Sequence, residues 1–109
     1  MLNQIVLVGR LVRTPEVEVL DSGKRVSSIT LAIPRCYKNA DGEDQTDFID
    51  CTLWDGVASN TSEYCKKGDI IGIKGRIETQ IYDVNGESRK SFSIIAEKVT
   101  FLSSSKVNC

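Results

Sequence analysis

The chain contains no histidine, and this absence removes the most common catalytic arrangements. Neither a serine–histidine–acid triad nor a cysteine–histidine pair can form, because both use an imidazole as the base. The sequence also lacks the glycine-rich phosphate loop of nucleotide hydrolases and the G-x-G-x-x-G pattern of dinucleotide-binding proteins. Its clustered carboxylates, Asp41, Glu43, Asp44 and Asp47, fall in a polar stretch typical of a solvated loop. We therefore expect that the protein is not an enzyme.

Long apolar runs and paired cysteines are missing as well. No stretch of about 18 apolar residues exists, so we expect no membrane span. The first residues lack the basic start, apolar stretch and cleavage site of a signal peptide, which predicts a cytoplasmic protein. The four cysteines, Cys36, Cys51, Cys65 and Cys109, are widely spaced without a C-x-x-C pair. We expect free thiols in a reducing compartment, and neither a metal nor another cofactor.

Net charge is also small, at -1 for 109 residues. Proteins that bind nucleic acid without sequence preference are usually basic, because neutralising phosphates provides most of their affinity. The overall charge alone therefore argues against a nucleic-acid partner. The positions of the basic residues, and the residues that accompany them, decide the question.

A hydrophobic period of two dominates the chain and predicts a mainly β protein. The predicted strands are 5–12, 26–33, 48–54, 70–82 and 92–102, with a slip in the last one near Glu97 that indicates a bulge. Asn85-Gly86 is a strong hairpin signal. The one predicted helix is 56–67, with Lys66 and Lys67 in its last turn and Gly68 as its C-cap.

The order of these elements is three strands, one helix and two strands, which is the order of the OB-fold. The fold class is thus all-β with one short helix, arranged as a five-stranded Greek-key barrel. We expect one domain over residues 1–102 and a short polar tail over 103–109.

Aromatic and basic side chains alternate with the predicted core residues on two strands. In 48–54, Ile49, Cys51 and Leu53 share the apolar face, while Phe48, Asp50, Thr52 and Trp54 share the other. In 70–82, the predicted core face is Ile71, Ile73, Gly75, Ile77, Thr79 and Ile81, and the outer face is Lys74, Arg76, Glu78, Gln80 and Tyr82. Large aromatics outside the core either pack against another subunit or the long loop, or bind a ligand.

Binding of single-stranded nucleic acid needs this combination, because any base can stack on an exposed ring and nearby cations hold the phosphates. The predicted DNA-binding residues are Tyr37, Phe48, Trp54, Tyr82, Arg35, Lys38, Lys74, Arg76, Arg89 and Lys90. The first strand is apolar on both faces, so we expect it to be buried between subunits. The predicted interface residues are Leu2, Ile5, Val6, Leu7 and Val8.

The sequence resembles the bacterial single-stranded DNA-binding protein family over residues 1–102. The resemblance rests on 2–11 (LNQIVLVGRL), Pro15-Glu16, 47–54 (DFIDCTLW), 64–68 (YCKKG) and 75–77 (GRI). It implies an OB-fold homotetramer, with a dimer as the alternative, that coats single-stranded DNA near the nucleoid in replication, recombination and repair. It also implies that Tyr37, Phe48, Trp54 and Tyr82 stack on bases.

Two departures from the family pattern bear on function. The chain has neither the long linker nor the acidic tip through which family members recruit other replication and repair proteins, so we do not expect that mode of recruitment. Asp50, Glu78 and Gln80 replace the arginine or neutral residues common among the stacking aromatics, which predicts weaker binding. The competing hypothesis is a tail-less OB-fold accessory protein, of primosomal type, that acts mainly through protein contacts.

Overall fold

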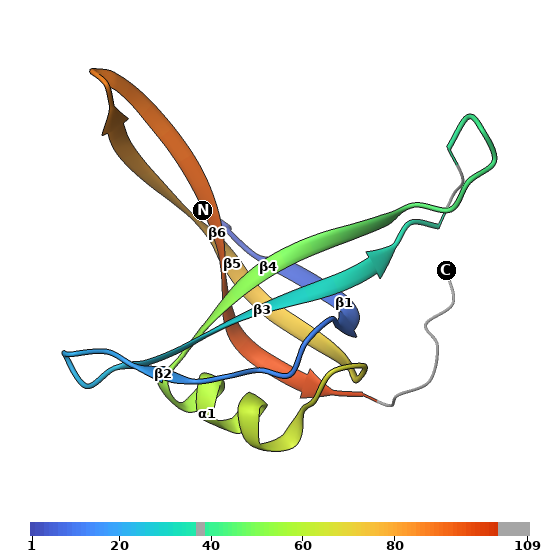
Figure 1. Cartoon of the computed structure of the whole chain (residues 1–109), viewed down its shortest axis with the longest axis horizontal. Helices are drawn as coiled ribbons and strands as arrows, with labels where there is room; N and C mark the ends of the chain where they lie inside the picture. Colours follow the sequence, from blue (N-terminus) through green and yellow to red (C-terminus); the bar gives the residue numbers. More distant parts are fainter. Residues whose placement is uncertain (37–38, 103–109) are drawn as a thin grey trace.

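The structure is a computed structural model that describes residues 1–36 and 39–102 (Figure 1). The described part contains six strands and one helix. They are β1 (Ile5–Leu11), β2 (Glu18–Val19), β3 (Arg25–Pro34), β4 (Thr46–Trp54), α1 (Asp55–Tyr64), β5 (Ile70–Val84) and β6 (Glu87–Phe101). The predicted Tyr37 and Lys38, and the tail 103–109, lie outside the described residues.

The sheet closes into a ring of five strands. Its order is β1-β5-β6-β4-β3-β2, and β1 also pairs with β3 to close the ring. The pairing of β4 with β6 is parallel and covers only two residue pairs, whereas the other pairings are antiparallel. The two-residue strand β2 adds to the free edge of β3 and was not predicted, because so short a strand leaves no periodic signal. The OB-fold prediction is confirmed.

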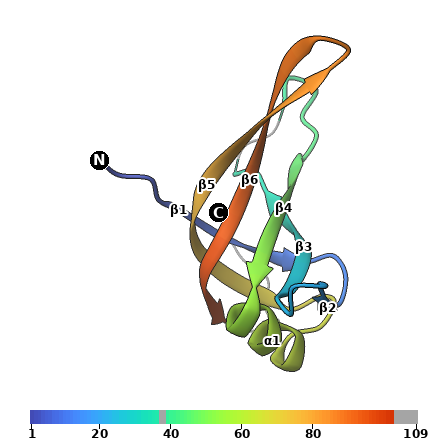
Figure 2. The same ribbon diagram turned by 90° about the vertical axis from the view of Figure 1, so that its left-hand side faces the viewer.

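The core fills the ring, and α1 packs across its lower end (Figure 2). Its most buried large side chains include Leu11, Ile29, Leu31, Leu53, Ile71 and Ile73. Ala58 joins this core from the helix, and the ring of Tyr64 packs 5.8 Å from that of Phe101 at the end of β6. Because the core covers only the inner face of each strand, residues on the outer face need not be apolar.

A bulge bends the β5–β6 pair, as the sequence predicted. The register shifts between Lys74 and Gly75, so that Lys74 faces Lys98 while Gly75 faces Ala96, and Glu97 is the extra residue. Position 75 needs glycine, because a Cβ there would lie 2.0 Å from the carbonyl oxygen of Ile95. This close approach lets the two strands curve around the barrel.

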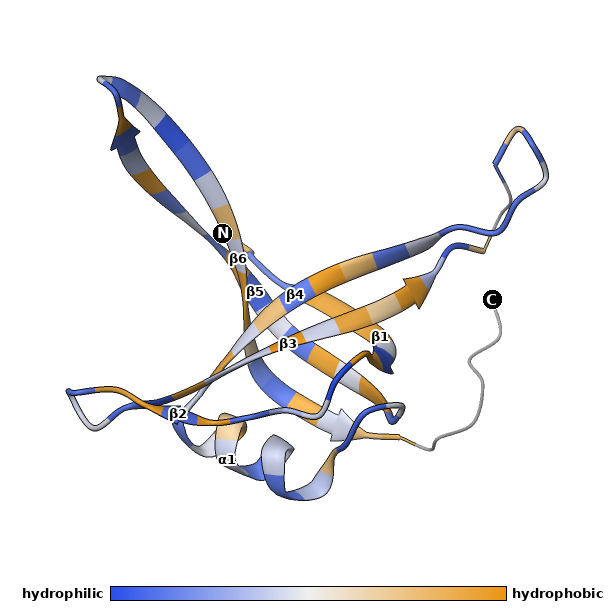
Figure 3. Cartoon of the chain, in the orientation of Figure 1, coloured by the Kyte–Doolittle hydropathy of each residue, from blue (hydrophilic) through white to orange (hydrophobic). Residues whose placement is uncertain are grey.

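Beyond the bulge, β5 and β6 leave the barrel as a two-stranded arm (Figure 1). Asn85 and Gly86 form its turn with φ angles of 52° and 83°, which confirms the hairpin prediction. The expected burial of the face that carries Ile77, Thr79 and Ile81 is wrong, since Ile81 is 72% exposed. The arm extends past the core, so this face has no layer over it. Figure 3 shows hydrophobic and hydrophilic residues alternating along the β5 strand of the arm.

The helix is shorter than the predicted 56–67. It begins at Asp55 and ends at Tyr64, and Cys65 caps it with an extended backbone. Lys66 and Asp69 form a turn instead, in which the Lys66 N–H donates to Oδ2 of Asp69 over 3.1 Å. Gly68 is therefore not the C-cap, and its N–H donates to the carbonyl oxygen of Leu11 over 2.9 Å. After Cys65 the chain therefore turns back to the end of β1 instead of continuing as a helix.

Candidate nucleic-acid interface

Two aromatic side chains stand on the outer face of β4. Phe48 is 67% exposed and Trp54 is 37% exposed, while Cys51 and Leu53 between them are buried. The strand is half-buried because the core covers only one of its two faces. β3 pairs along its edge and leaves the outer face uncovered. Burial raises the pKa of the Cys51 thiol to about 11, which fits an unreactive core residue. The alternation predicted for this strand is thus present in the structure.

Trp54 also marks the end of the strand. The next residue, Asp55, has a φ of 47°, an unusual left-handed conformation for a residue other than glycine. Its Oδ1 accepts a hydrogen bond from the Arg25 N–H over 3.1 Å, which holds the start of α1 against β3. The sharp turn places Trp54 at the corner where strand, helix and the β2–β3 turn meet.

The predicted aromatic Tyr82 lies on a different part of the molecule. It is 49% exposed and faces Arg89 across the β5–β6 arm. This arm and the β3–β4 hairpin point apart in Figure 1, and β6 pairs with β4 only at Cys51 and Thr52. Tyr82 therefore does not adjoin Phe48 or Trp54. A bound strand that reached all three would have to run from the barrel onto the arm.

The three predicted arginines are all engaged by carboxylates of the same chain. Arg35 pairs with Asp47 at 2.9 Å, and Arg89 pairs with Glu87 at 3.2 Å. Arg76 pairs with Glu78 at 2.6 Å and with Glu97 at 3.3 Å. The hydrogen bond from Arg35 and its positive charge hold the pKa of the Asp47 carboxyl below its ordinary value. Each of these guanidinium groups therefore already has a carboxylate partner within the chain.

The two predicted lysines among the described residues, Lys74 and Lys90, lie on other faces. Lys90 is opposite Ile81, on the apolar side of the arm, whereas Tyr82 and Arg89 occupy the other side. Lys74 lines a hollow with Val6 and is separated from Arg76 by the bulge. The structure therefore does not gather all the predicted cations on one surface.

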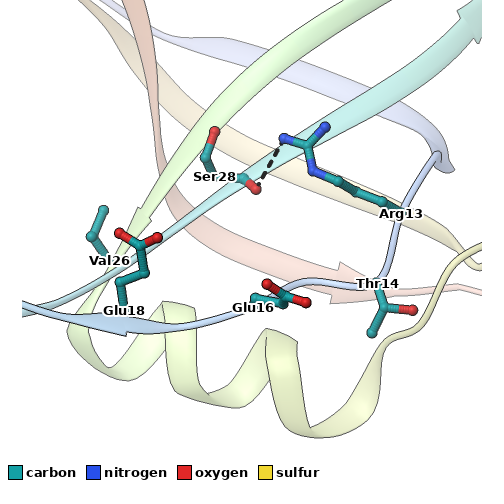
Figure 4. Close-up of a pocket in the computed structure, with 6 residues that line it drawn as sticks. All are labelled: Arg13, Thr14, Glu16, Glu18, Val26 and Ser28. Carbon is teal, nitrogen blue, oxygen red and sulfur yellow. Dashed lines mark hydrogen bonds between the residues drawn. The ribbon is translucent and has the colours of Figure 1, made fainter.

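The outer face of the sheet continues over β3, which the sequence analysis missed. Val26 and Ser28 lie beside Trp54 and Thr52 in the ladder. They form the floor of a groove of about 430 Å³ whose other wall is the segment 13–18 (Figure 4). Arg13 crosses this groove and donates to the carbonyl oxygen of Ser28 over 3.4 Å.

Lys24 is a further residue that the sequence analysis missed. It sits in the turn between β2 and β3 and lines a pocket with Trp54 and Arg76. The residues at 21–24 (DSGK) are typical of a turn, so its existence can be read from the sequence. Lys24 lies near Trp54 because Val26 pairs with Trp54 in the sheet, and only the folded structure reveals this pairing.

Acidic groups also lie on the outer face, as expected from the sequence. Oδ1 of Asp50 accepts a hydrogen bond from the Thr30 hydroxyl over 2.5 Å, which fixes this carboxylate between the two aromatic positions of β4. Glu78 is held by Nε and Nη2 of Arg76. Both carboxylates place negative charge beside the predicted DNA-binding residues.

A second exposed surface lies on β1 and has a different character. Val6 is 67% exposed and Val8 is 37% exposed, and they border a shallow hollow of about 220 Å³ with Leu102. Ile5 and Leu7 point the other way and are half-buried, and Leu7 packs against the core. Leu2 precedes the strand and is 87% exposed. The predicted interface residues thus divide between an inner and an outer face.

The described residues contain no group of three or more metal-ligating side chains placed to hold an ion. No helix among them has the length and hydropathy needed to cross a membrane.

Comparison with known proteins identifies the family. The model of the single-strand binding protein family, whose members are non-enzymatic DNA-binding proteins, matches residues 2–102. The chain is 41% identical to "Single-stranded DNA-binding protein B" of Bacillus subtilis over 104 residues, covering 94% of this chain and 91% of the relative. It is 46% identical to "Single-stranded DNA-binding protein" of Halalkalibacterium halodurans, again over 94% of this chain.

The lengths of these relatives differ, since the chain spans only 61% of the H. halodurans protein. Among solved structures, "Plasmodium falciparum SSB complex with ssDNA" superimposes with a TM-score of 0.76 at 22% identity, covering 94% of this chain and 96% of the other. That likeness establishes the same fold. Because the family model covers nearly the whole described chain and the relatives match throughout it, the chain belongs to the single-strand binding protein family.

Proposed function

We propose that this protein binds single-stranded DNA without sequence preference and protects it during replication, recombination and repair. The observation that carries the proposal is the pair of exposed aromatics, Phe48 and Trp54, on the outer face of β4 in a member of this family. Each ring offers a flat apolar surface on which any base can stack, for about 1–3 kcal/mol per base. The expected location is the cytoplasm, at the nucleoid.

Because the arginines are already paired with carboxylates, base stacking supplies a larger share of the binding free energy than phosphate contacts do. Phosphate contacts stabilise a complex chiefly by releasing counterions from the nucleic acid. An arginine that already neutralises a carboxylate must exchange that partner for a phosphate, as Arg35, Arg89 and, at its contact with Glu97, Arg76 would. The carboxylate it leaves then takes up a cation from solution, which offsets part of the gain. Stacking has no such competitor, so Phe48 and Trp54 carry the interaction.

We also propose that the chain assembles into a homotetramer through the outer side of β1. Val6 and Val8 expose apolar surface around a hollow whose lining is mainly apolar. A patch of this kind on a regular strand marks a contact between proteins. Placing the interface here leaves the outer face of β4 free for DNA. A dimer would be the smaller product of the same contact.

The test of binding follows the fluorescence of Trp54, the one tryptophan of the chain, during titration with a thymidine homopolymer. We expect strong quenching by the homopolymer and much weaker quenching by a duplex of equal length, because duplex bases are already stacked. Equal responses to both, or none to either, would contradict the proposal. That result, together with a stable complex with another protein, would favour the accessory-protein hypothesis.

A further inference from the structure

An open pocket lies beside Trp54, and two cations from distant parts of the chain line it. Lys24 comes from the turn between β2 and β3, and Arg76 comes from β5, while Asp55 and Glu97 place carboxylates in the same lining. The pocket has a volume of about 390 Å³, within the range of about 300–1,000 Å³ typical of small-ligand sites. An indole surface and two cations in one hollow are the groups that a single nucleotide unit needs, because they meet its base and its phosphate.

The two cations differ in what already contacts them. Nε and Nη2 of Arg76 both donate to Oε2 of Glu78, at 3.1 and 2.6 Å. Its remaining terminal nitrogen, Nη1, donates to Oε2 of Glu97 over 3.3 Å. Lys24 has no ion pair within the parts of the chain that the structure describes. Glu97 thus accepts from Nη1, the one side-chain nitrogen of Arg76 that does not donate to Glu78.

The bulge explains why Glu97 is there. It is the extra residue opposite the Lys74–Gly75 step, and it follows two consecutive buried residues, Ile95 and Ala96. Bulges redirect side chains in this way and are frequent beside functional sites. Glu97 itself lines the pocket and is 53% exposed, so water screens its contact with Arg76. An exposed pair of this length is weak.

We infer that Lys24 and Arg76 together form a phosphate seat beside Trp54, and that Glu97 occupies this seat in the free protein. The inference rests on the proposed function, since it places one phosphate of the bound single strand in the pocket. That phosphate replaces Glu97 at Nη1 of Arg76 and meets the ammonium group of Lys24, while the adjoining base stacks on Trp54. Arg76 keeps its contact with Glu78 throughout.

This arrangement makes Glu97 a residue that lowers affinity. When the phosphate enters, the displaced carboxylate remains near another negative charge, and the repulsion is strongest at low ionic strength. Lys24 has the opposite role, because it gains a phosphate without giving up a carboxylate. Removing the charge of Glu97 should therefore strengthen binding, whereas removing the charge of Lys24 should weaken it.

The experiment measures the affinity of the whole chain for a labelled thymidine homopolymer by fluorescence anisotropy across a series of salt concentrations. Glu97→Gln is compared with Glu63→Gln, which removes an equal charge from an exposed position on α1. We expect Glu97→Gln to bind about two- to five-fold more tightly than Glu63→Gln at low salt, with the gap closing as salt rises. Lys24→Ala is compared with Lys66→Ala, and only Lys24→Ala should reduce the log–log salt slope, by about 0.7.

The outcomes separate this inference from the proposed function. If the wild type binds the homopolymer and each variant behaves like its control, the phosphate seat is overturned while single-strand binding stands. If the wild type does not bind the homopolymer, the proposed function fails and the seat fails with it. Thermal melting of all four variants establishes that they are folded, as their exposed positions predict.

Discussion

The outer sides of β4 and β1 are both exposed in one chain, yet they differ in what surrounds their apolar groups. On β4, Phe48 and Trp54 are separated by Asp50 and Thr52. On β1, Val6 and Val8 border a hollow with few polar atoms. A ligand with flat bases and a charged backbone fits the first pattern, because rings and polar groups alternate there. A second protein surface fits the second pattern, because an apolar patch can be buried completely.

The largest effect should come from charging the β1 surface. We predict that Val6→Asp combined with Val8→Asp breaks the assembly, because an unpaired carboxylate buried between subunits is strongly destabilising. Light scattering at micromolar concentration should show the mass falling from that of four chains toward that of one. Val19→Asp is the matched control, since Val19 is 69% exposed on β2. A monomeric wild type, or an unchanged mass in the double variant, would refute this role for β1.

The next largest effect should come from removing a ring on β4. We predict that Phe48→Ala and Trp54→Ala each weaken binding of single-stranded DNA by about 1–3 kcal/mol, or about 5- to 150-fold, without loss of the fold. Phe92→Ala is the matched control, because Phe92 is 71% exposed and lies on the β5–β6 arm, on the side opposite Tyr82. Binding measured by anisotropy should change little for this control. An equal loss of affinity in Phe92→Ala would contradict the prediction, because it would show that the effect does not depend on the outer face of β4.

The smallest effect should come from neutralising single carboxylates on the outer face. Asp50→Asn retains an oxygen that can accept the Thr30 hydrogen bond while removing a charge that would face phosphates. Glu78→Gln removes the main ion-pair partner of Arg76. We predict that both variants bind single-stranded DNA more tightly than Glu63→Gln, most clearly at low salt where screening is weakest. Affinities equal to that of Glu63→Gln would show that neither carboxylate faces the strand.

The sequence predicted the outer face of β4 because local pattern and tertiary environment agree there. One side of the strand meets the core, so a period of two is enough to assign Cys51 and Phe48 to opposite faces. The same period failed on β5 at Ile77 and Ile81, since it assigns a face without revealing whether anything covers it. The length of the arm beyond the barrel decides that question.

The parts of the site that were missed depend on contacts between distant segments. Lys24 lies by Trp54 only because β3 pairs with β4 in one register, and Arg13 reaches Ser28 only because the segment 13–18 passes along β3. The ion pair of Arg76 with Glu97 needs the bulge, which turns Glu97 toward β5. Composition revealed that the charges balance, but only the fold shows which charges meet.

Crosslinking tests the division between the two surfaces most directly. A single strand carrying 5-iodouracil is irradiated in complex with the protein, and the modified peptides are identified by mass spectrometry. The account predicts crosslinks at Phe48 and Trp54 on β4, and none within β1 (Ile5–Leu11). Crosslinks confined to β1, with β4 unmodified, would contradict it.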